Sequence, residues 1–403
     1  MIKLTINKKV IIFGFIFTFF SSFGQSFFLG IFNSSIRNDL SITHGQFGTI
    51  YASATLLSSF LLIWIGKKID DINILNFSLL VIILLSFSCF FFSKISSVYI
   101  LFIAIFLMRF SGQGMMSHTA TTTISRYFNK SRGKALSTGW FGLSTAEFIL
   151  PVLMIFLLGL TDWRNIWIAI SVLVIIFLPL ASFFLVKKIN LDSREPSDED
   201  NFKEKNIKQW TRIDVLKDYR FYIICSNMLA MPWIATGVFV YQSFILTSKG
   251  WGPYIIAQSF MVYSITSVIT LFLSGFLIDR YSSRNLLVYM NIPLLLSAIV
   301  LFYFKNPISS FFFLGLIGIS NGLANVLGSS TWAEIYGVKH IGSIKALTTA
   351  LMVFATAFGT ALFGILIDLG FSIENISVVS GTYIFLSLLL LFLIRSKLNP
   401  TLL

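Results

Sequence analysis

The chain has 403 residues, of which 56% are hydrophobic and only 12% charged, and its mean hydropathy is +0.84. These values exclude a soluble globular domain and indicate a protein of the lipid bilayer. The net charge of +13 does not by itself indicate a nucleic-acid partner, because lysine and arginine also collect in the cytoplasmic loops of membrane proteins.

Twelve apolar runs are long enough to cross a hydrocarbon core of about 30 Å, which takes roughly 20 helical residues. The first run follows Lys8 and Lys9 as in a signal peptide, but it has no small-residue cleavage site, and we interpret it as a retained helix. The sequence therefore predicts an all-α integral membrane protein with twelve transmembrane helices, near residues 10–32, 45–65, 75–93, 98–125, 136–159, 165–186, 219–247, 254–277, 286–304, 308–334, 345–369 and 375–394.

The basic residues predict the topology. If the N-terminus is inside, 24 of the 30 lysines and arginines fall in inner segments, 5 fall in outer segments, and Arg109 alone lies within a span. The positive-inside rule then places both termini in the cytoplasm of a bacterium, with the protein in the inner membrane and no nucleic-acid partner. Cys89 and Cys225 both fall in spans, so we expect no structural disulfide.

The first span carries a repeated pattern of mostly polar residues. Thr18, Ser22, Gln25, Leu29 and Asn33 follow one another at steps of three or four, which puts them on one face of a regular helix. Gln25 lies near the middle of this face and is a candidate substrate-binding residue.

The fourth span contains an arginine at half depth. Arg109 lies about 12 residues from the outer end of its helix, roughly 18 Å at the usual rise. A charge there costs about 2.5–3.5 kcal/mol, so the guanidinium should face a cavity or a partner. One alternative is binding of substrate or coupling to protons, with Gln113 on the same face. The other is a packing role in which helix-end carbonyls or one acid satisfy the arginine. His118 points the opposite way, and we interpret it as a packed, hydrogen-bonded histidine.

Glu147 in the fifth span is the only other charge at this depth. Counted from the loop between the two helices, it differs in height from Arg109 by roughly 7–8 Å, which a long arginine side chain nearly spans. Two roles remain open from the sequence. Glu147 carries a proton, or it forms an ion pair with Arg109.

The least membrane-like stretch is 187–218, which we interpret as a solvated cytoplasmic linker between bundles at 1–186 and 219–403. The two halves repeat one another. Gly66 to Asp70 recurs 209 residues later as Gly275 to Asp279, and other matches follow at nearly the same offset: Gly114 with Gly322, and Lys134 with Lys345. This pattern predicts two six-helix bundles of like orientation, an arrangement typical of transporters.

Over its whole length the chain resembles the major facilitator superfamily. The residues that carry this resemblance are the two Gly-x-x-x-Asp loops, Arg109 to Gly114, the glycines and Pro151 of the fifth span, and Asp162-Trp163-Arg164. Two further stretches resemble the monocarboxylate and oxalate-formate branch: Arg126 to Ala135, and Trp332 to Gly337 with Ile365 to Asp368. The resemblance implies alternating access between two bundles, and proton coupling or anion binding at Arg109.

The second half offers comparable cavity residues. They are polar or aromatic side chains within the seventh, eighth and tenth spans: Tyr241, Gln242, Tyr263, Asn321 and Asn325. Pro232 and Gly237 could let the seventh helix bend.

The repeated loops are the most specific motif. A glycine there permits a tight turn and an acid can cap a helix, and the resemblance implies that these loops close the inner side. The charges are exchanged between the halves. The expected cytoplasmic gate therefore consists of Gly66 and Gly275 in the turns, with two ionic clusters, Asp70 and Asp71 with Arg126, and Arg280 and Arg284 with Asp279 and Glu334.

These features predict a secondary active transporter that works as a monomer without a cofactor or metal. Arg109 and the branch resemblance favour a small organic anion, a monocarboxylate or dicarboxylate, moved with protons or by anion exchange. The alternative is a proton-coupled exporter of amphiphilic or cationic compounds that recognises them through Glu147. A non-transporting membrane sensor is the alternative from another class. Neither a nucleotide-binding loop nor a set of convergent histidines suggests an enzyme: His44, His118 and His340 are scattered.

Overall fold

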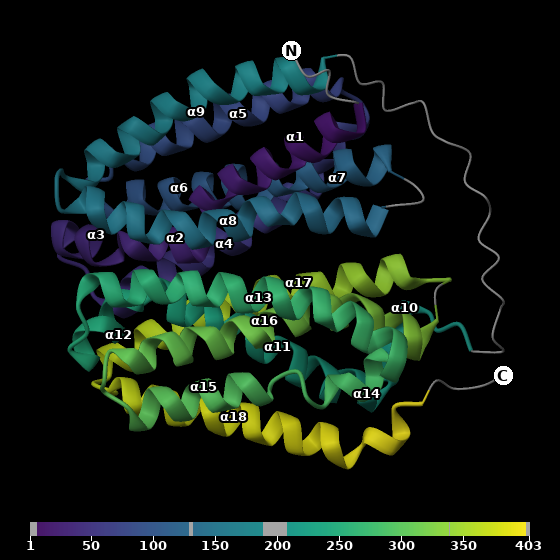
Figure 1. The fold of residues 1–403 in the computed structure, drawn as a ribbon. Helices are drawn as coiled ribbons and strands as arrows, with labels where there is room; N and C mark the ends of the chain where they lie inside the picture. Colours follow the sequence, from purple (N-terminus) through teal and green to yellow (C-terminus); the bar gives the residue numbers. More distant parts are fainter. Residues whose placement is uncertain (1–5, 129–131, 188–207, 338, 400–403) are drawn as a thin grey trace. The chain divides into compact units, whose positions relative to one another are not determined.

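The structure is a computed structural model. It describes residues 6–128, 132–187, 208–337 and 339–399, apart from the side chains of Ile6, Asp70, Arg132, Gly133, Asp279 and Ser329. Within these ranges the regular structure is entirely helical (Figure 1). Twelve helical stretches are long and apolar enough to cross a membrane. The predicted all-α architecture with twelve spans is therefore confirmed.

The chain divides into two compact units, residues 1–200 and 201–403, called here the first and the second unit. Of the expected linker 187–218, residues 188–207 lie outside the described residues. The described remainder is folded: it contains the short helix α10 (Arg212–Lys217), and Val215 in this helix is fully buried in the second unit. The Trp210 amide also donates to the Tyr336 carbonyl at 3.0 Å.

The first unit contains six membrane-crossing stretches, several of which consist of more than one helical segment. In chain order its segments are α1 (Ile6–Ser21), η1 (Ser22–Gly24), α2 (Ser26–Ile31), α3 (Asn33–Leu40), α4 (His44–Ile65), η2 (Gly66–Asp70), α5 (Ile74–Phe92), α6 (Val98–Met108), the π-helical η3 (Arg109–Met116), α7 (Ser117–Tyr127), α8 (Arg132–Leu158) and α9 (Trp163–Val186).

The second unit contains the other six crossings and the end of the linker. After α10, its segments are α11 (Tyr219–Val240), α12 (Gln242–Lys249), α13 (Pro253–Tyr281), α14 (Ser283–Leu287), α15 (Ile292–Tyr303), α16 (Ile308–Tyr336), α17 (Ile341–Asp368), α18 (Ile373–Leu393) and η4 (Arg395–Lys397).

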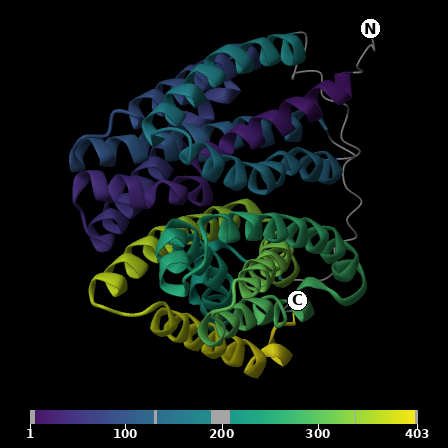
Figure 2. The same ribbon diagram turned by 60° about the vertical axis from the view of Figure 1, so that its left-hand side comes forward.

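The two units repeat the same packing scheme. In the first, α1 packs on α8, α4 on α6 and η3, and α5 on α9; in the second, α11 packs on α17, α13 on α16, and α15 on α18 (Figures 1 and 2). Equivalent helices begin at a nearly constant offset, since α4 and α13 start 209 residues apart and α9 and α18 start 210 apart. The internal repeat expected from sequence is therefore present in the helix packing.

Capping residues fix where these helices begin and end. Thr43 and Gln46 form a capping box at the start of α4, and the side chains of Asp162 and Ser372 accept backbone amides at the starts of α9 and α18. α3 ends at Ser41 (φ 51°) and α12 ends at Gly250 (φ 68°), both in the left-handed conformation that closes helices. These two residues are also 209 apart in sequence.

Ion pairs join the repeat-related ends of each unit, with exchanged signs. In the first unit Asp39 of α3 pairs with Arg164 of α9 and accepts from the Trp163 indole at 3.0 Å. The hydrogen bond from Arg164 holds the pKa of Asp39 below its usual value. In the second unit Lys249 of α12 pairs with Glu374 of α18 at 2.8 Å. Each pair ties the extension of a first helix to the start of the sixth helix in the same unit.

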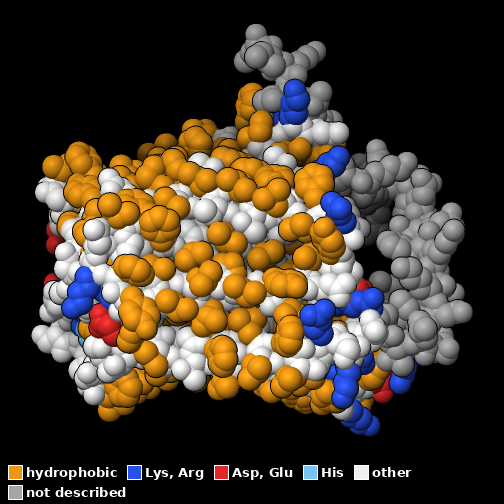
Figure 3. Space-filling view, turned by 60° about the horizontal axis from the view of Figure 1, so that its bottom comes forward, with side chains coloured by type: hydrophobic (Ala, Val, Ile, Leu, Met, Phe, Trp, Pro, Cys, Tyr) orange, Lys and Arg blue, Asp and Glu red, His pale blue; other side chains and the backbone are white. Residues whose placement is uncertain are grey.

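Apolar side chains cover the outer face of the second unit. Figure 3 shows hydrophobic side chains over the face formed by α15 and α18, with lysine and arginine gathered toward its ends. The exposed residues on these two helices include Leu296, Ile299, Phe385, Leu386, Leu389 and Leu390. Such a surface is what a lipid-facing helix pair requires.

Candidate functional site

The first helix and the fourth helix of the first unit are both irregular at the same level. The first helix is interrupted at Gln25, whose backbone is extended (φ −82°, ψ 153°) between η1 and α2. The fourth helix is π-helical over η3, and this segment packs against η1 and α4. Segments of π-helix occur frequently at functional sites, because the extra residue per turn re-aims the side chains around it.

Two glycines allow the irregular segments to touch through their backbones. A Cβ on Gly24 would lie 2.3 Å from the Met108 carbonyl oxygen and 2.4 Å from the Gln113 nitrogen. A Cβ on Gly112 would lie 2.7 Å from the Gly24 nitrogen. Neither position accepts a larger residue without movement of the backbone. The contact therefore fixes the register of the first helix against the fourth.

Arg109 donates hydrogen bonds to the first helix where that helix is interrupted. Its Nη1 donates to the Gly24 carbonyl at 3.0 Å and to the Ser26 hydroxyl at 3.3 Å. The carbonyl needs such a donor because the helix stops there and offers no amide. Tyr51 of α4 places its ring 5.3 Å from the guanidinium carbon and donates its hydroxyl to Ser26 at 3.0 Å. The Arg109 side chain is only 2% exposed. Its contacts match the packing role that the sequence left open, in which helix-end carbonyls satisfy the arginine.

The Arg109 site also has spare donor capacity. The Nε atom of Arg109 is buried without a hydrogen-bond partner among the residues that the structure describes. Gln25 and Gln113, the two other candidates in this unit, are half-buried at the interruption and in η3 respectively. This part of the first unit thus combines a buried cation with two amide side chains.

Glu147 stands apart from Arg109. It is 8% exposed on α8, one turn before Pro151, and α8 packs against α1 and α2 on either side of the interruption. Within the described ranges its carboxylate has neither a hydrogen bond nor an ion pair, so the structure does not contain the pairing with Arg109 that the sequence left open. A carboxyl group at this depth without a partner is costly if ionised.

The second-unit candidates divide into three that lie together and two on α16. The Tyr241 hydroxyl donates to the Thr360 carbonyl at 3.0 Å, and the Gln242 side-chain amide donates to the Phe239 carbonyl at 2.9 Å. Tyr263 packs edge-on against the ring of Phe239, with centroids 5.3 Å apart. All three side chains are buried. Phe239 contacts two of them: Gln242 through its backbone carbonyl and Tyr263 through its ring.

The two candidates on α16 differ in exposure. The Asn321 side-chain amide donates to the Ser267 hydroxyl of α13 at 2.9 Å. Asn325, one turn further along, is exposed. An asparagine exposed within a membrane-crossing helix favours contact with water or a polar ligand over contact with acyl chains.

The seventh helix is not interrupted at the two residues where the sequence suggested a bend. α11 continues through Pro232 and Gly237, and a Cβ on Gly237 would lie 2.5 Å from the ring of Phe363. The glycine therefore admits a close contact with α17. The direction of the chain changes at Tyr241 (φ −104°, ψ 24°), between α11 and α12.

In the first unit, two side chains of the fourth helix hold the loop that begins at Gly66. The Nε2 atom of His118 lies 3.0 Å from the Gly66 carbonyl, and Nη1 of Arg126 donates to the Ile69 carbonyl at 3.2 Å. His118 is thus a packed, hydrogen-bonded residue as expected. Asp71 pairs with Lys68 at 3.7 Å on the exposed side of the loop. The side chain of Asp70 lies outside the described residues.

In the second unit, the expected turn at Gly275 is wrong. α13 continues through Gly275 to Tyr281, and nothing lies within 4 Å of a Cβ built on this glycine. The turn comes instead at Ser282, a non-glycine residue with φ 68°. In the first unit Gly66 likewise has an ordinary right-handed conformation (φ −57°). Neither glycine is therefore required by a left-handed turn.

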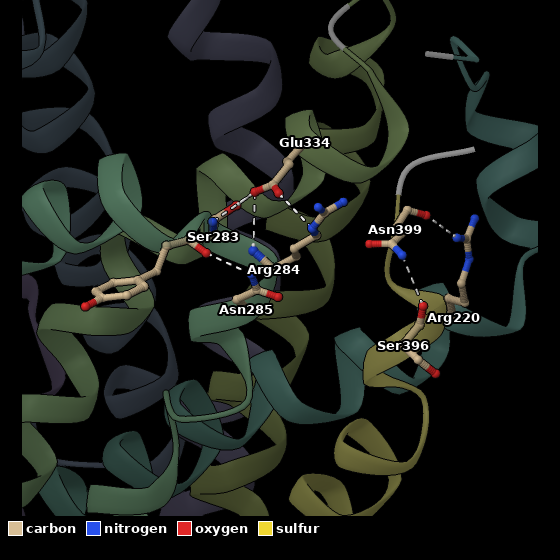
Figure 4. A network of polar contacts seen from close by, with 8 residues as sticks. Arg220, Ser283, Arg284, Asn285, Glu334, Ser396 and Asn399 are labelled. Carbon is tan, nitrogen blue, oxygen red and sulfur yellow. Dashed lines mark hydrogen bonds and ion pairs between the residues drawn. The ribbon is translucent and has the colours of Figure 1, made fainter. Parts of the chain in front are cut away.

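Glu334 closes the second loop. Its carboxylate accepts the Ser283 amide at 2.9 Å, the Ser283 hydroxyl and the Arg284 amide at 3.3 Å (Figure 4). The Arg284 Nε lies 3.2 Å from the other carboxylate oxygen, a charge contact without hydrogen-bond geometry. The expected pair of Arg284 and Glu334 is therefore present. Arg280 packs over the Tyr281 ring at 5.3 Å, and the Asp279 side chain is outside the described residues.

These contacts give a physical reason for the exchanged charges. Arg126 and Glu334 are repeat-related, 208 residues apart. The arginine binds a carbonyl at the C-terminal end of the second crossing, where the helix dipole is negative, and the glutamate binds amides at the start of α14, where it is positive. Each charged side chain therefore complements the backbone groups at the helix end of its own loop.

We expect the replacement Glu334→Gln to lower the free energy of unfolding by about 0.5–2 kcal/mol, the usual contribution of a helix cap. Glu334→Arg should cost more, because it turns a guanidinium toward two amide donors. Thermal unfolding of the purified protein measures both. The control is Asp71→Asn, an exposed acid in the equivalent loop, for which we expect a change within about 0.5 kcal/mol. An equal effect of Glu334→Arg and Asp71→Asn would contradict the capping role.

Two repeated six-helix units, each with an interrupted first helix and a buried polar centre, define a membrane transporter. The chain belongs to the Major Facilitator Superfamily, whose family model matches residues 14–360 and 222–402. This confirms the superfamily that the sequence motifs indicated.

Similar proteins include transporters that are named for nucleosides. The purine ribonucleoside efflux pump NepI of Escherichia coli O157:H7 is 24% identical over 360 residues, which cover 88% of this chain and 86% of the relative. Among solved structures, a bacterial homologue of the human lysosomal transporter Spinster, inward-facing and unoccupied, matches with a TM-score of 0.74 at 13% identity, covering 98% and 99% of the two chains. The nucleoside transporter NupG matches with a TM-score of 0.70 at 15% identity, covering 98% and 99%. None of these proteins is named as a monocarboxylate carrier, so the branch resemblance gains no support from them.

Proposed function

We propose that the protein is a proton-coupled exporter of a neutral, nucleoside-like small molecule, working by alternating access as a monomer in a bacterial inner membrane. The observation that carries this proposal is Glu147, a buried carboxyl group without a partner in the described structure. Such a group can gain and lose a proton without breaking an ion pair, which is the requirement for a proton carrier. The expected topology, with both termini cytoplasmic, belongs to the same proposal.

The substrate class rests on two arguments. NepI, similar over most of this chain, is named a purine ribonucleoside efflux pump. Arg109, which would have selected an organic anion, already donates to Gly24 and Ser26. The remaining polar candidates, Gln25, Gln113 and Asn325, are uncharged hydrogen-bonding groups that suit the base edges and hydroxyls of a nucleoside.

One observation still favours the organic anion of the sequence analysis. Arg109 Nε is buried and unpartnered among the described residues, and a carboxylate that reached it would gain a charge-assisted hydrogen bond. A proton-coupled or exchanging anion carrier is therefore the second candidate function.

Transport by purified protein in proteoliposomes tests both candidates. Under an imposed pH gradient, we expect labelled inosine, guanosine or adenosine to move against its concentration, and labelled lactate or oxalate to remain at the level of protein-free liposomes. Movement of the carboxylates alone would overturn the nucleoside proposal in favour of the anion carrier. Nucleoside movement that is unchanged when the pH gradient is removed would overturn the proton coupling.

A further inference from the structure

Apolar and aromatic side chains are exposed at the start of the second unit, in α10 and the first turn of α11. α10 has one buried side chain, Val215, while Ile213 is 66% exposed and Leu216 is 39% exposed. The exposed row continues into the first turn of α11 with Tyr219 and Tyr222, both more than half exposed. The Tyr222 hydroxyl donates to the Leu216 carbonyl at 2.8 Å, which ties the two helices together.

Basic side chains surround this row, which we call the α10 surface. Lys208, Arg212 and Lys217 are exposed in the same segment. Arg395 and Lys397 of η4 are exposed in the C-terminal segment, which Arg220 holds by donating to the carbonyls of Lys397 and Asn399 at 3.0 and 3.1 Å (Figure 4).

A buried ionic cluster sets the position of the α10 surface. Asp218 accepts from Arg220 Nε at 2.8 Å and from the Tyr336 hydroxyl at 3.1 Å, and its carboxylate also caps α11. Arg220 lies near the rings of Trp210 and Tyr336. These contacts join the segment before α11 to α16 and to the C-terminal residues. The α10 surface is therefore built on a packed base rather than on a free linker.

The acid within this surface does not cancel its charge. Asp214 is the one acidic residue between Lys208 and Lys217. It accepts the amide of Thr211 at 3.0 Å and its hydroxyl at 2.6 Å, and its single negative charge offsets only one of the five positive charges. Five exposed basic residues thus flank four exposed apolar or aromatic ones. Membrane-crossing α11 begins at Tyr219, so chain continuity puts this surface at the edge of the bilayer.

We propose that the α10 surface binds the anionic headgroup layer of the membrane, with Ile213, Leu216, Tyr219 and Tyr222 inserted among the acyl chains near the headgroups. Tyrosines favour this interface, and a basic helix with an apolar face lies in its plane. Each basic residue near an anionic surface contributes about fivefold to binding. This inference does not depend on the transported substrate.

Hydrogen exchange of residues 208–222 in nanodiscs tests the proposal. We expect slower exchange when phosphatidylglycerol is added to phosphatidylcholine, and this slowing should disappear in the triple variant Lys208→Gln, Arg212→Gln, Lys217→Gln. The matched control neutralises three basic residues of the first unit, Lys67→Gln, Lys68→Gln, Lys134→Gln, and should keep the slowing. The variant Ile213→Ser, Leu216→Ser should exchange faster in both lipids.

Several results would overturn the proposal. Exchange that does not respond to phosphatidylglycerol in the unmodified protein would do so, as would loss of the response in the control variant. Inorganic phosphate added to protein in detergent should give no slowing, and equal slowing there would assign the basic residues to a soluble anion. A global change in thermal stability of the triple variant would show that the packed base is disrupted. The proposal would then be tested by the Ile213→Ser, Leu216→Ser variant, and unchanged exchange in that variant would overturn it.

Discussion

The replacement Glu147→Gln is expected to abolish transport driven by a pH gradient and to leave the exchange of labelled for unlabelled substrate intact. Glutamine has nearly the size and hydrogen-bonding shape of a protonated glutamic acid, but it cannot release a proton. The carrier would therefore continue to change its facing with substrate bound while losing its coupling to protons. Driven efflux and counterflow, measured on the same proteoliposomes, separate the two activities.

Stability distinguishes this coupling role from a structural one. Because the Glu147 carboxylate has no partner in the described structure, Glu147→Gln should leave the free energy of unfolding unchanged or raise it. Loss of one member of a buried ion pair would instead cost about 3–5 kcal/mol. Thr145→Ala, a half-buried change in the same helix, is the control and should retain both activities. Retention of driven efflux in Glu147→Gln would remove Glu147 from the coupling mechanism.

Much of the fold could be predicted because its signals are local. Span lengths follow from hydropathy, and the repeat offset of 209 residues between Gly66 and Gly275 reappears between the starts of α4 and α13. Helix caps such as Thr43 and Asp162 can be predicted because threonine and aspartate favour the position before a helix start. These features depend on a few neighbouring residues and therefore survive in a single sequence.

The candidate site was less predictable because it depends on departures from helical periodicity. The face drawn through Thr18, Gln25 and Asn33 assumed one regular helix, but the first crossing is interrupted at Gln25 without a proline. Thr18 instead bonds the Gly139 carbonyl of α8. The π-helical segment adds residues to a turn of the fourth helix, and a single added residue rotates the remainder of the helix by about 100°. Counting along ideal helices therefore brings Arg109 to nearly the height of Glu147, whereas its hydrogen-bond partners Gly24 and Ser26 are on the first crossing and Tyr51 is on the second.

The partners of the charged residues in the expected cytoplasmic gate were also hard to predict from the sequence. The charges alone group Asp70 and Asp71 with Arg126; among the described side chains, Arg126 donates to the Ile69 carbonyl and Asp71 pairs with Lys68. Backbone groups at helix ends carry partial charges that a sequence does not display, and they compete well with exposed side chains. The expected pair of Arg284 and Glu334 is present because Glu334, in the last turn of α16, caps the start of α14, where Arg284 lies.

Arg109→Ala is expected to lower the free energy of unfolding by about 2–4 kcal/mol, the sum of hydrogen bonds from a charged group and a contact with an aromatic ring. It would leave the Gly24 carbonyl without its donor at the interruption of the first helix, where α1 and α2 depend on that register. Arg109→Lys should give a smaller loss, since an ammonium group keeps the charge but not the planar fork. Thermal unfolding and substrate counterflow, measured together, check these expectations.

The same experiment decides between the two roles of Arg109. If the arginine supports the interrupted helix, stability and transport fall together, and Gln113→Ala in the same π-helical segment changes stability by less than about 1 kcal/mol. If it binds an anionic substrate, Arg109→Ala keeps its stability while a carboxylate no longer raises the unfolding temperature, because ligand stabilisation follows mass action. The contacts to Gly24, Ser26 and Tyr51 favour the first outcome. A guanidinium held in this way stabilises the interrupted helix on which the position of Gln25 depends.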